Sequence, residues 1–362
     1  MKLKLKPLNE QVVVITGATS GIGLSTARAA AQRGARLLLV ARNAEALKAV
    51  CDDLTAKDAK ADYCVADVGD QSQVRAVVQT ALDRFGGFDA WVNNAGVSIF
   101  GHITDTPVED QRRLMETNYW GVVYGSLAAV EHFKTRDGGG ALINIGSVLG
   151  DLAVPLKGPY CASKHAVRAF TNALRLEMIE QKAPVSVTLI KPSAVDTPYK
   201  DHARNLTGAP VRNPPPVYAT PLVAQAVLYA AEHRTREITI GAGGRLVAAL
   251  AGLAPFAADP LLAWFTPMLN RDKAGRRRVV GDNLHQPGGD LRERSFYKDV
   301  RETSLYTAAQ MRPKAVLALA VLAGAAAGLA FALGRRRGPA PAVAKARAQP
   351  DASPARAVRA RA

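Results

Sequence analysis

The sequence predicts an α/β fold, a single doubly wound domain in which helices cover both faces of a parallel sheet. Short runs rich in Val, Ile and Leu alternate over residues 8–245 with longer amphipathic stretches. The runs are apolar throughout, which is typical of strands buried on both faces, and not alternately apolar and polar. Regular alternation of strands and helices favours a parallel sheet, because each helix carries the chain back to the start of the next strand.

The elements follow one another in a regular order. We expect strands at QVVVIT, ARLLLV, FDAWVN, ALINIG, VSVTLI and EITIG, which begin at residues 11, 35, 88, 141, 185 and 237. The clearest helices are SGIGLSTARAAAQRG at 20–34 and KHAVRAFTNALRLEMIEQK at 164–182. We therefore take residues 8–245 as one domain.

The chain changes character after this domain. Residues 246–269 are apolar but are interrupted by Pro255, Pro260 and Pro267. Because proline breaks helices, we expect short helices here, which can lie at a membrane surface. Residues 270–312 are polar and charged and predict a linker.

A second apolar segment follows the linker. Residues 313–334 contain an uncharged run from Ala315 to Gly334 that is long enough to cross a bilayer. We expect a transmembrane helix there, with a buried soluble helix as the alternative. Residues 335–362, rich in Ala, Pro and Arg, predict a disordered basic tail. The arginines beyond the span must either cross the bilayer or stay among its headgroups, and the sequence leaves both arrangements open.

Charge and composition exclude several kinds of site. The formal net charge is +16, and most of the excess lies after residue 269 beside the apolar segment. We therefore expect membrane lipid, and no nucleic acid, as the acidic partner. Neither the three cysteines nor the six histidines show a CxxC or HxxxH spacing, so we expect no metal. No secretory signal precedes Val12, and three cysteines without a disulfide or ligand spacing fit a reducing compartment, so we expect the catalytic domain in the cytoplasm.

A glycine-rich turn follows the first strand. TGATSGIG, from Thr16 to Gly23, opens the first predicted helix. Its glycines allow a tight turn and a close approach of the backbone to a diphosphate, whose charge the helix N-terminus would meet. Arg42 ends the second strand, where an NAD-binding protein usually has an acid. A cation there suits the 2′-phosphate of NADP(H). Asp67, in ADV between the strands that begin at residues 35 and 88, is a candidate for the adenine amino group.

YCASK, from Tyr160 to Lys164, places a phenol and an ammonium one helical turn apart. A free tyrosine has a pKa near ~10, and a neighbouring ammonium would lower that pKa. Tyr160 could then exchange a proton with an alcohol or carbonyl oxygen at neutral pH.

TGATSGIG, NNAG at 93–96, Asn118 in METNYWG, Ser147 in NIGSVLG and YCASK occur in this order. In these motifs the chain resembles the short-chain dehydrogenase/reductase family over about residues 8–245. The resemblance implies a Rossmann-type domain with a seven-stranded parallel sheet, and usually a homo-oligomer. It also implies the roles of the catalytic residues. Ser147 would orient the reacting oxygen, Lys164 would hold the nicotinamide ribose, and Asn118 would hold a water that extends the proton relay.

The motifs and the resemblance together give the expected site. The expected catalytic residues are Asn118, Ser147, Tyr160 and Lys164. The expected cofactor-binding residues are Thr16, Gly17, Thr19, Ser20, Gly21, Ile22, Gly23, Arg42, Asp67, Val68, Asn93, Asn94, Ala95, Gly96, Tyr160, Lys164, Pro192, Val195 and Thr197. One position departs from the family pattern: KPSAVDTP has Ser193 where a glycine is common, and serine restricts the backbone of that turn.

The sequence thus predicts an NADP(H)-dependent oxidoreductase, attached to a membrane by its C-terminal segment, that interconverts a hydrophobic alcohol and its ketone or aldehyde. Apolar candidates for the substrate pocket are Ile99, Phe100, Leu149, Val154 and Tyr199. Two alternatives remain open. One is an NADP(H)-binding sensor or scaffold without turnover, and the other is an enone reductase or epimerase on the same fold.

Overall fold

The computed structural model describes residues 2–270, 282–288, 291–295 and 297–312, together with positions 316, 318 and 321. Residues up to Met311 form one compact unit, and Arg312 to Ala362 form a second. Most of the predicted transmembrane segment 313–334 and all of the predicted tail 335–362 lie outside the described residues. Within the described part of the chain, no helix has the length and apolarity needed to span a bilayer.

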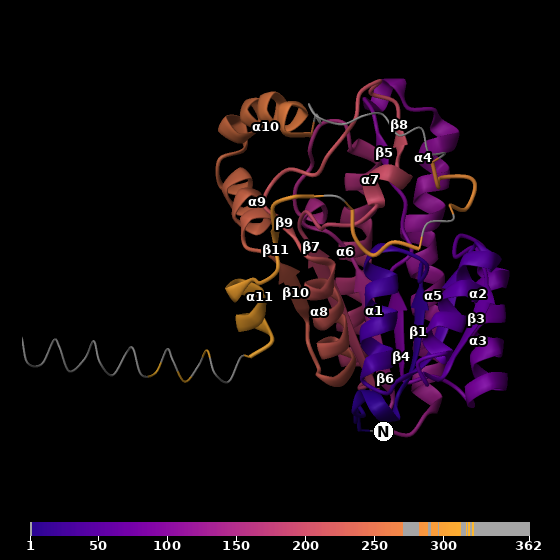
Figure 1. Cartoon of the computed structure of the whole chain (residues 1–362). Coiled ribbons are helices and arrows are strands. Elements are labelled where there is room, and N and C mark those ends of the chain that lie inside the picture. The colour runs from indigo at the N-terminus through magenta and orange to yellow at the C-terminus, as the bar shows by residue number, and fades with distance from the viewer. Residues whose placement is uncertain are drawn as a thin grey trace, which may run out of the picture. The chain divides into compact units, whose positions relative to one another are not determined.

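A seven-stranded sheet forms the centre of the first unit (Figure 1). Its strands lie in the order β10-β7-β6-β4-β1-β2-β3, and every neighbouring pair is parallel. The strands are β1 (Val12–Thr16), β2 (Arg36–Ala41), β3 (Ala61–Val65), β4 (Ala90–Asn93), β6 (Gly140–Ile145), β7 (Val185–Pro192) and β10 (Glu237–Ile240). The predicted doubly wound parallel sheet is therefore confirmed.

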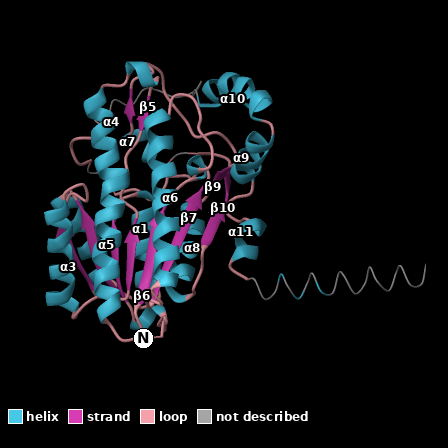
Figure 2. Cartoon of the chain, turned by 180° about the vertical axis from the view of Figure 1, so that it is seen from behind, coloured by secondary structure: helices cyan, strands magenta, loops and turns pink. Residues whose placement is uncertain are grey.

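Helices cover both faces of this sheet (Figure 2). The α-helices of the domain are α1 (Gly21–Gln32), α2 (Ala44–Thr55), α3 (Gln71–Phe85), α4 (Val108–Met115), α5 (Gly121–Thr135), α6 (Gly158–Glu180), α7 (Tyr199–His202) and α8 (Thr220–Glu232). A π-helical turn, η3 (Glu116–Trp120), joins α4 to α5. Short strands β5 (Ile99–Phe100), β8 (Arg204–Asn205), β9 (Val217–Tyr218) and β11 (Val300–Arg301) pair outside the main sheet.

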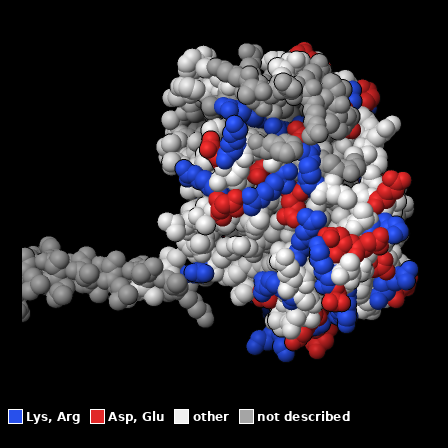
Figure 3. Space-filling model, in the orientation of Figure 1, with Lys and Arg blue, Asp and Glu red and all other residues white. Residues whose placement is uncertain are grey.

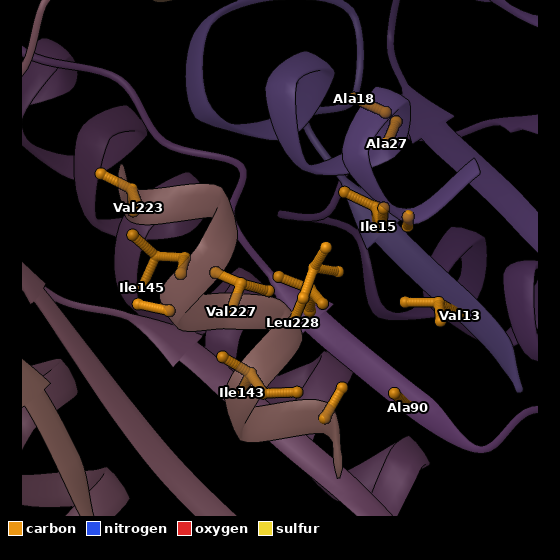
Figure 4. Packing of buried hydrophobic residues seen from close by; sticks show 14 of the residues in the cluster. Val13, Ile15, Ala18, Ala27, Ala90, Ile143, Ile145, Val223, Val227 and Leu228 are labelled. Carbon is orange, nitrogen blue, oxygen red and sulfur yellow. The ribbon is translucent and has the colours of Figure 1, made fainter. Parts of the chain in front are cut away.

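Alternate residues of each strand enter two separate cores. Val13 and Ile15 of β1 pack with α1 and α8 on one face, where Val227 belongs to the same cluster (Figure 4). Val12 and Val14 of the same strand face α3, α5 and α6 on the other side. Because both faces are buried, apolar side chains are favoured on both, which explains the largely apolar runs of the strands.

The outer surface of α1 and α2 is charged in both signs. Lys48 pairs with Asp52 at 2.6 Å on α2, and Lys57, just beyond the end of α2, pairs with Asp53 at 2.6 Å. Figure 3 shows basic and acidic side chains interspersed over this part of the molecule. Such exposed pairs are typical of a solvated helix face and contribute little to stability.

Two further helices follow the sheet. As expected for residues 246–269, the chain forms separate short helices, α9 (Gly243–Leu253) and α10 (Pro255–Asn270). The break falls at Ala254 and Pro255, whereas Pro260 and Pro267 lie inside α10. Helix α9 packs against η4 (Val148–Gly150), a 3-10 turn beside the site described below.

The region predicted as a linker, residues 270–312, makes ordered contacts with the domain where it is described. Strand β11 pairs with β9, with Val300 opposite Val217. Helix α11 (Leu305–Gln310) lies beside β10, where Thr307 donates a hydrogen bond to Thr239 O at 3.1 Å. Main-chain pairing does not require an apolar sequence, so the polar composition of this region concealed its structure.

Candidate active site

A cavity of about 310 Å³ opens at the carboxyl ends of the sheet strands. This edge is where ligands bind in open parallel sheets. Seventeen of the predicted site residues line it: Gly17, Thr19, Ser20, Gly21, Ile22, Arg42, Asp67, Val68, Asn94, Ala95, Gly96, Ser147, Tyr160, Lys164, Pro192, Val195 and Thr197. Thr16, Gly23, Asn93 and Asn118 do not line it. Most of the predicted residues thus converge on one cavity, and the other four lie outside its lining.

The turn between β1 and α1 is built by two glycines. Gly17 has a φ of +67°, a left-handed conformation that favours glycine. At Gly23 a Cβ would lie 2.0 Å from the carbonyl oxygen of Gly17, so only glycine lets α1 begin so close to the turn. Ser20, the N-cap residue of α1, makes no side-chain capping bond. The first-turn amides of α1 thus lack the usual side-chain acceptor, and that of Gly21 donates to the main-chain carbonyl of Arg292 at 2.9 Å. The amides that follow Gly21 in this turn are donors that suit a diphosphate.

Behind this turn, Thr16 and Asn94 brace the strand ends. Thr16 Oγ1 accepts hydrogen bonds from the amides of Asn94 at 2.9 Å and Ala95 at 3.1 Å. Asn94 Nδ2 in turn donates to Thr16 O at 2.8 Å. Asn93 points the other way, because successive strand residues face opposite sides, and its Nδ2 donates to Asn144 Oδ1 at 2.9 Å inside the core. Asn93 therefore supports the sheet and does not face the cavity.

Arg42 lies at the far end of the cavity, as expected. Its guanidinium donates to the main-chain carbonyls of Asn283, Leu284 and His285, the last two at 3.3 and 3.4 Å. Burial lowers the pKa of Arg42, and the charge of Asp67 partly opposes this shift. A guanidinium has five N–H donors, so these carbonyls do not use up its capacity to bind a further oxyanion.

Asp67 has protein partners that the sequence did not predict. Its Oδ2 accepts a hydrogen bond from Arg113 of α4, and its Oδ1 accepts one from the amide of Gly69 at 2.9 Å. Arg113 Nε also donates to Leu284 O at 3.1 Å. Arg42, Asp67 and Arg113 therefore form one charged cluster, covered by residues 282–288.

This covering segment is anchored on both sides of the cavity. Leu284 is fully buried and packs with Val97 and Ile99, in a cluster that Tyr160 also touches. Beyond this segment, the carbonyl of Arg292 accepts a hydrogen bond from the amide of Gly21 at 2.9 Å. Residues far along the chain therefore contribute part of the wall of this cavity, and no local pattern indicated them.

Tyr160 and Ser147 are neighbours in the cavity wall. Ser147 follows β6 and caps η4, where its Oγ accepts a hydrogen bond from the amide of Leu149 at 3.1 Å. The Tyr160 phenol keeps some access to the cavity, but burial raises its pKa, while polar contacts with Tyr199 and Ser147 lower it. The expected lowering by Lys164 is not what the structure shows, because desolvation outweighs the other influences.

Lys164 is buried behind Tyr160. Its Nζ donates to Ile145 O at 2.9 Å and lies 5.7 Å from the centroid of the Tyr160 ring. Burial lowers the pKa of Lys164 to about 8. The two groups are thus neighbours on one face of α6, as their spacing predicted.

Asn118 lies in the π-helical turn η3 and is completely buried. Its Nδ2 donates to Val97 O at 3.0 Å and to Ser163 Oγ at 3.1 Å, and its Oδ1 accepts from the amide of Val97 at 2.8 Å. Both amide hydrogens are therefore used within the protein. The observed role of this side chain is to hold the segment around Val97 against α6.

Ser193 causes no strain at the position where the family often has glycine. Of the described non-glycine residues, those with a positive φ are Asp58, Leu156 and Lys182, so Ser193 keeps an ordinary backbone conformation. Thr197 lines the cavity, and its methyl group faces Gly21. Serine at position 193 therefore does not keep Thr197, a predicted cofactor-binding residue, from the cavity wall.

The apolar pocket candidates divide into two groups. Leu149 and Tyr199 line the cavity, whereas Ile99, Phe100 and Val154 do not. Residues that the sequence analysis did not single out also line it, among them Ser98, Lys157 and Asn283. Lys157 carried a usable signal, since it lies three residues before Tyr160 and seven before Lys164, on the same helix face. Among the described residues, no group of three His, Cys, Asp or Glu side chains could hold a metal.

Comparison with known proteins agrees with this geometry. The family model described as short chain dehydrogenase matches residues 11–206. The chain belongs to the short-chain dehydrogenase family. It is 43% identical over 328 residues to the uncharacterized oxidoreductase YxnA of Bacillus subtilis (strain 168), covering 89% of this chain and 91% of that protein. It is accordingly an oxidoreductase of this family.

More distant relatives match a smaller part of the chain. Dehydrogenase/reductase SDR family member 7B of Bos taurus is 38% identical over 192 residues, which are 51% of this chain and 58% of that protein. A solved short-chain dehydrogenase/reductase from Burkholderia phymatum, in complex with NAD, is 26% identical. It superposes with a TM-score of 0.64 over 70% of this chain and 96% of its own. An alcohol dehydrogenase from Thermococcus sibiricus, complexed with 5-hydroxy-NADP, is 27% identical with a TM-score of 0.56, over 64% and 95%.

Proposed function

We propose that this enzyme is an NADP(H)-dependent oxidoreductase that interconverts a lipophilic alcohol and its ketone or aldehyde. The observation that carries the proposal is the convergence of Ser147, Tyr160 and Lys164 on one cavity whose other end holds Arg42. Solved relatives bound to NAD and to a modified NADP support a nicotinamide dinucleotide in this cavity. Such a cofactor supplies or accepts the hydride when it is bound.

The side chains divide the remaining work between them. Ser147 donates a hydrogen bond that orients the substrate oxygen, and Tyr160 exchanges a proton with that oxygen. Lys164 stabilises the phenolate that proton donation leaves behind. The Tyr160 phenol is protonated at neutral pH, since burial moves its pKa further above the ordinary value near 10, and it can donate its proton to a carbonyl oxygen.

Arg42 is the basis for preferring NADP(H) over NAD(H). A 2′-phosphate is an oxyanion that a guanidinium binds with charge-assisted hydrogen bonds. Arg113 lies in the same charged cluster through Asp67, so the cluster carries two cations for one carboxylate. Replacing Arg42 by Ser should raise the KM for NADPH by about tenfold or more while changing that for NADH little. An equal effect on both cofactors would contradict this assignment.

The proposal is tested by following NADPH oxidation with hydrophobic ketones, aldehydes and enones. Turnover of ketones that is lost in Tyr160→Phe, a variant that keeps the ring and removes the proton, would support the assignment. Reduction of enones alone would favour the double-bond reductase. Tight NADPH binding without turnover in either direction would favour a sensor.

We further propose that helices α9 and α10 lie against a lipid surface. Large apolar side chains are exposed around both helices: Leu246, Val247, Leu250, Leu253, Phe256, Leu261, Trp264, Phe265 and Met268. Phe256 is 94% exposed and Leu253 83%. Patches of this kind mark interaction sites, and the basic run RDKAGRRR that follows in the sequence complements anionic headgroups.

Vesicle sedimentation tests this attachment. A chain ending at residue 310 should still bind anionic vesicles, and Phe256→Ser with Trp264→Ser should weaken that binding. If the truncated chain fails to bind while retaining activity, attachment depends on residues after 310.

A further inference from the structure

Lys157 is a buried cation in the cavity that the proposed proton relay does not use. It is the N-cap residue of α6, one turn before Tyr160, and is 6% exposed. Its Nζ lies 4.4 Å from the centroid of the Phe100 ring and 6.0 Å from that of Tyr160. Tyr160 therefore lies between two ammonium groups on one helix face, those of Lys157 and Lys164.

The surroundings of Lys157 differ from those of the other buried lysines. Lys191 pairs with Asp151 at 2.6 Å and with Glu237 at 2.7 Å. Lys164 donates to a main-chain carbonyl. Among the residues that the structure describes, none offers the Lys157 ammonium an oxygen within hydrogen-bond distance, and its polar contact is with aromatic ring faces.

This arrangement is unfavourable unless the ammonium meets an anion. A buried charge without a partner loses its hydration and gains little in return. The N-terminus of a helix is also its positive end, which repels a cation and attracts an anion. Burial lowers the pKa of Lys157 to about 8, so the amine is largely protonated at neutral pH. Lys157 and the α6 N-terminus thus attract the same kind of group from the cavity.

We propose that Lys157 binds a carboxylate of the substrate, so that the substrate is a lipophilic oxo acid or hydroxy acid. This inference rests on the proposed function and specifies its substrate class. Because the ammonium lies beside the ring of Tyr160, the carboxylate is separated from the reacting carbonyl by a few bonds. Val148 and Leu149 line the same cavity and suit the apolar remainder of the substrate.

Binding of matched probes tests the inference independently of turnover. Octanoate and octanamide differ in charge but not in length, and their Kd values can be measured by calorimetry on the full chain with NADPH present. We expect octanoate to bind about tenfold more tightly than octanamide, a preference that Lys157→Arg keeps and Lys157→Gln removes. Lys200→Gln is the matched control, because Lys200 contacts an aromatic ring, that of Tyr297 at 5.0 Å, but does not line the cavity.

Turnover provides a second measurement. For 3-oxooctanoate and its methyl ester, Lys157→Gln should lower the ratio of the two kcat/KM values by about tenfold, mainly through the KM of the acid. An equal loss on acid and ester, or equal octanoate binding by wild type and Lys157→Gln, would overturn the inference. If no carbonyl compound turns over but octanoate binding depends on Lys157, the proposed function fails while the carboxylate site stands.

Discussion

Replacing Lys157 by Met should stabilise the folded protein while impairing its function. Methionine replaces the aliphatic stem of the lysine and removes the buried ammonium that lies over the Phe100 ring. Burial lowers the pKa of Lys157 from 10.5 to about 8, so the folded state binds its proton less tightly than the unfolded state does. The wild-type protein therefore loses stability by keeping this charge buried.

The magnitude follows from that shift. At about 1.4 kcal/mol per pKa unit, the shift corresponds to roughly 3 kcal/mol of destabilisation at neutral pH. The variant also loses the ammonium–ring contacts, which contribute about 1–2 kcal/mol. We expect a net gain of about 1–2 kcal/mol in the free energy of unfolding. Because the folded pKa is depressed, the wild-type penalty is fully present below about pH 8 and fades as pH rises to 10.5.

Urea unfolding at pH 7 and at pH 9.5 measures this effect. Lys157→Met should be more stable than wild type at pH 7, and the difference should shrink at pH 9.5. Lys191→Met is the contrasting control, because it removes the buried cation that pairs with both Asp151 and Glu237. Arg168 and Arg245 still contact these carboxylates, so the loss of stability should be below the roughly 3–5 kcal/mol of a fully broken buried pair. A Lys157→Met protein that folds but is less stable than wild type at pH 7 would refute the reasoning.

Three other changes have defined outcomes. Gly23→Ala places a Cβ 2.0 Å from Gly17 O, so it should abolish cofactor binding, measured by NADPH fluorescence, and binding near wild-type affinity would contradict the packing. Leu284→Ala removes a fully buried side chain and should cost about 2–5 kcal/mol of local stability, seen as faster hydrogen exchange in residues 282–288, whereas unchanged exchange would mean that Leu284 is not the anchor. Lys164 has a pKa of about 8, so kcat for ketone reduction should fall as pH rises through that value, and a profile flat to pH 9.5 would show that its charge is not required.

Local spacing predicted the sheet and most of the candidate site residues that line the cavity. The apolar strand runs indicated burial on both faces, and Val12 and Val13 do enter opposite cores. Tyr160 and Lys164 are one turn apart, so a helix places them on the same face whatever surrounds it. Gly17 and Gly23 belong to the short connection from β1 into α1, where neighbours in the sequence decide the backbone conformation. These properties depend only on periodicity and local sterics.

Tertiary packing decided the rest, because burial and long-range partners depend on which surfaces meet. The position of Asp67 in the sequence made it a candidate to bind adenine, but in the folded protein it pairs with Arg113 of α4. Leu284 belongs to a polar stretch that composition assigned to a linker, yet it packs beside residues of the cavity wall. The spacing of Lys157 from Tyr160 places both on one helix face, but the sequence does not show that this lysine is buried. Its lowered pKa arises from burial, which only the fold brings about.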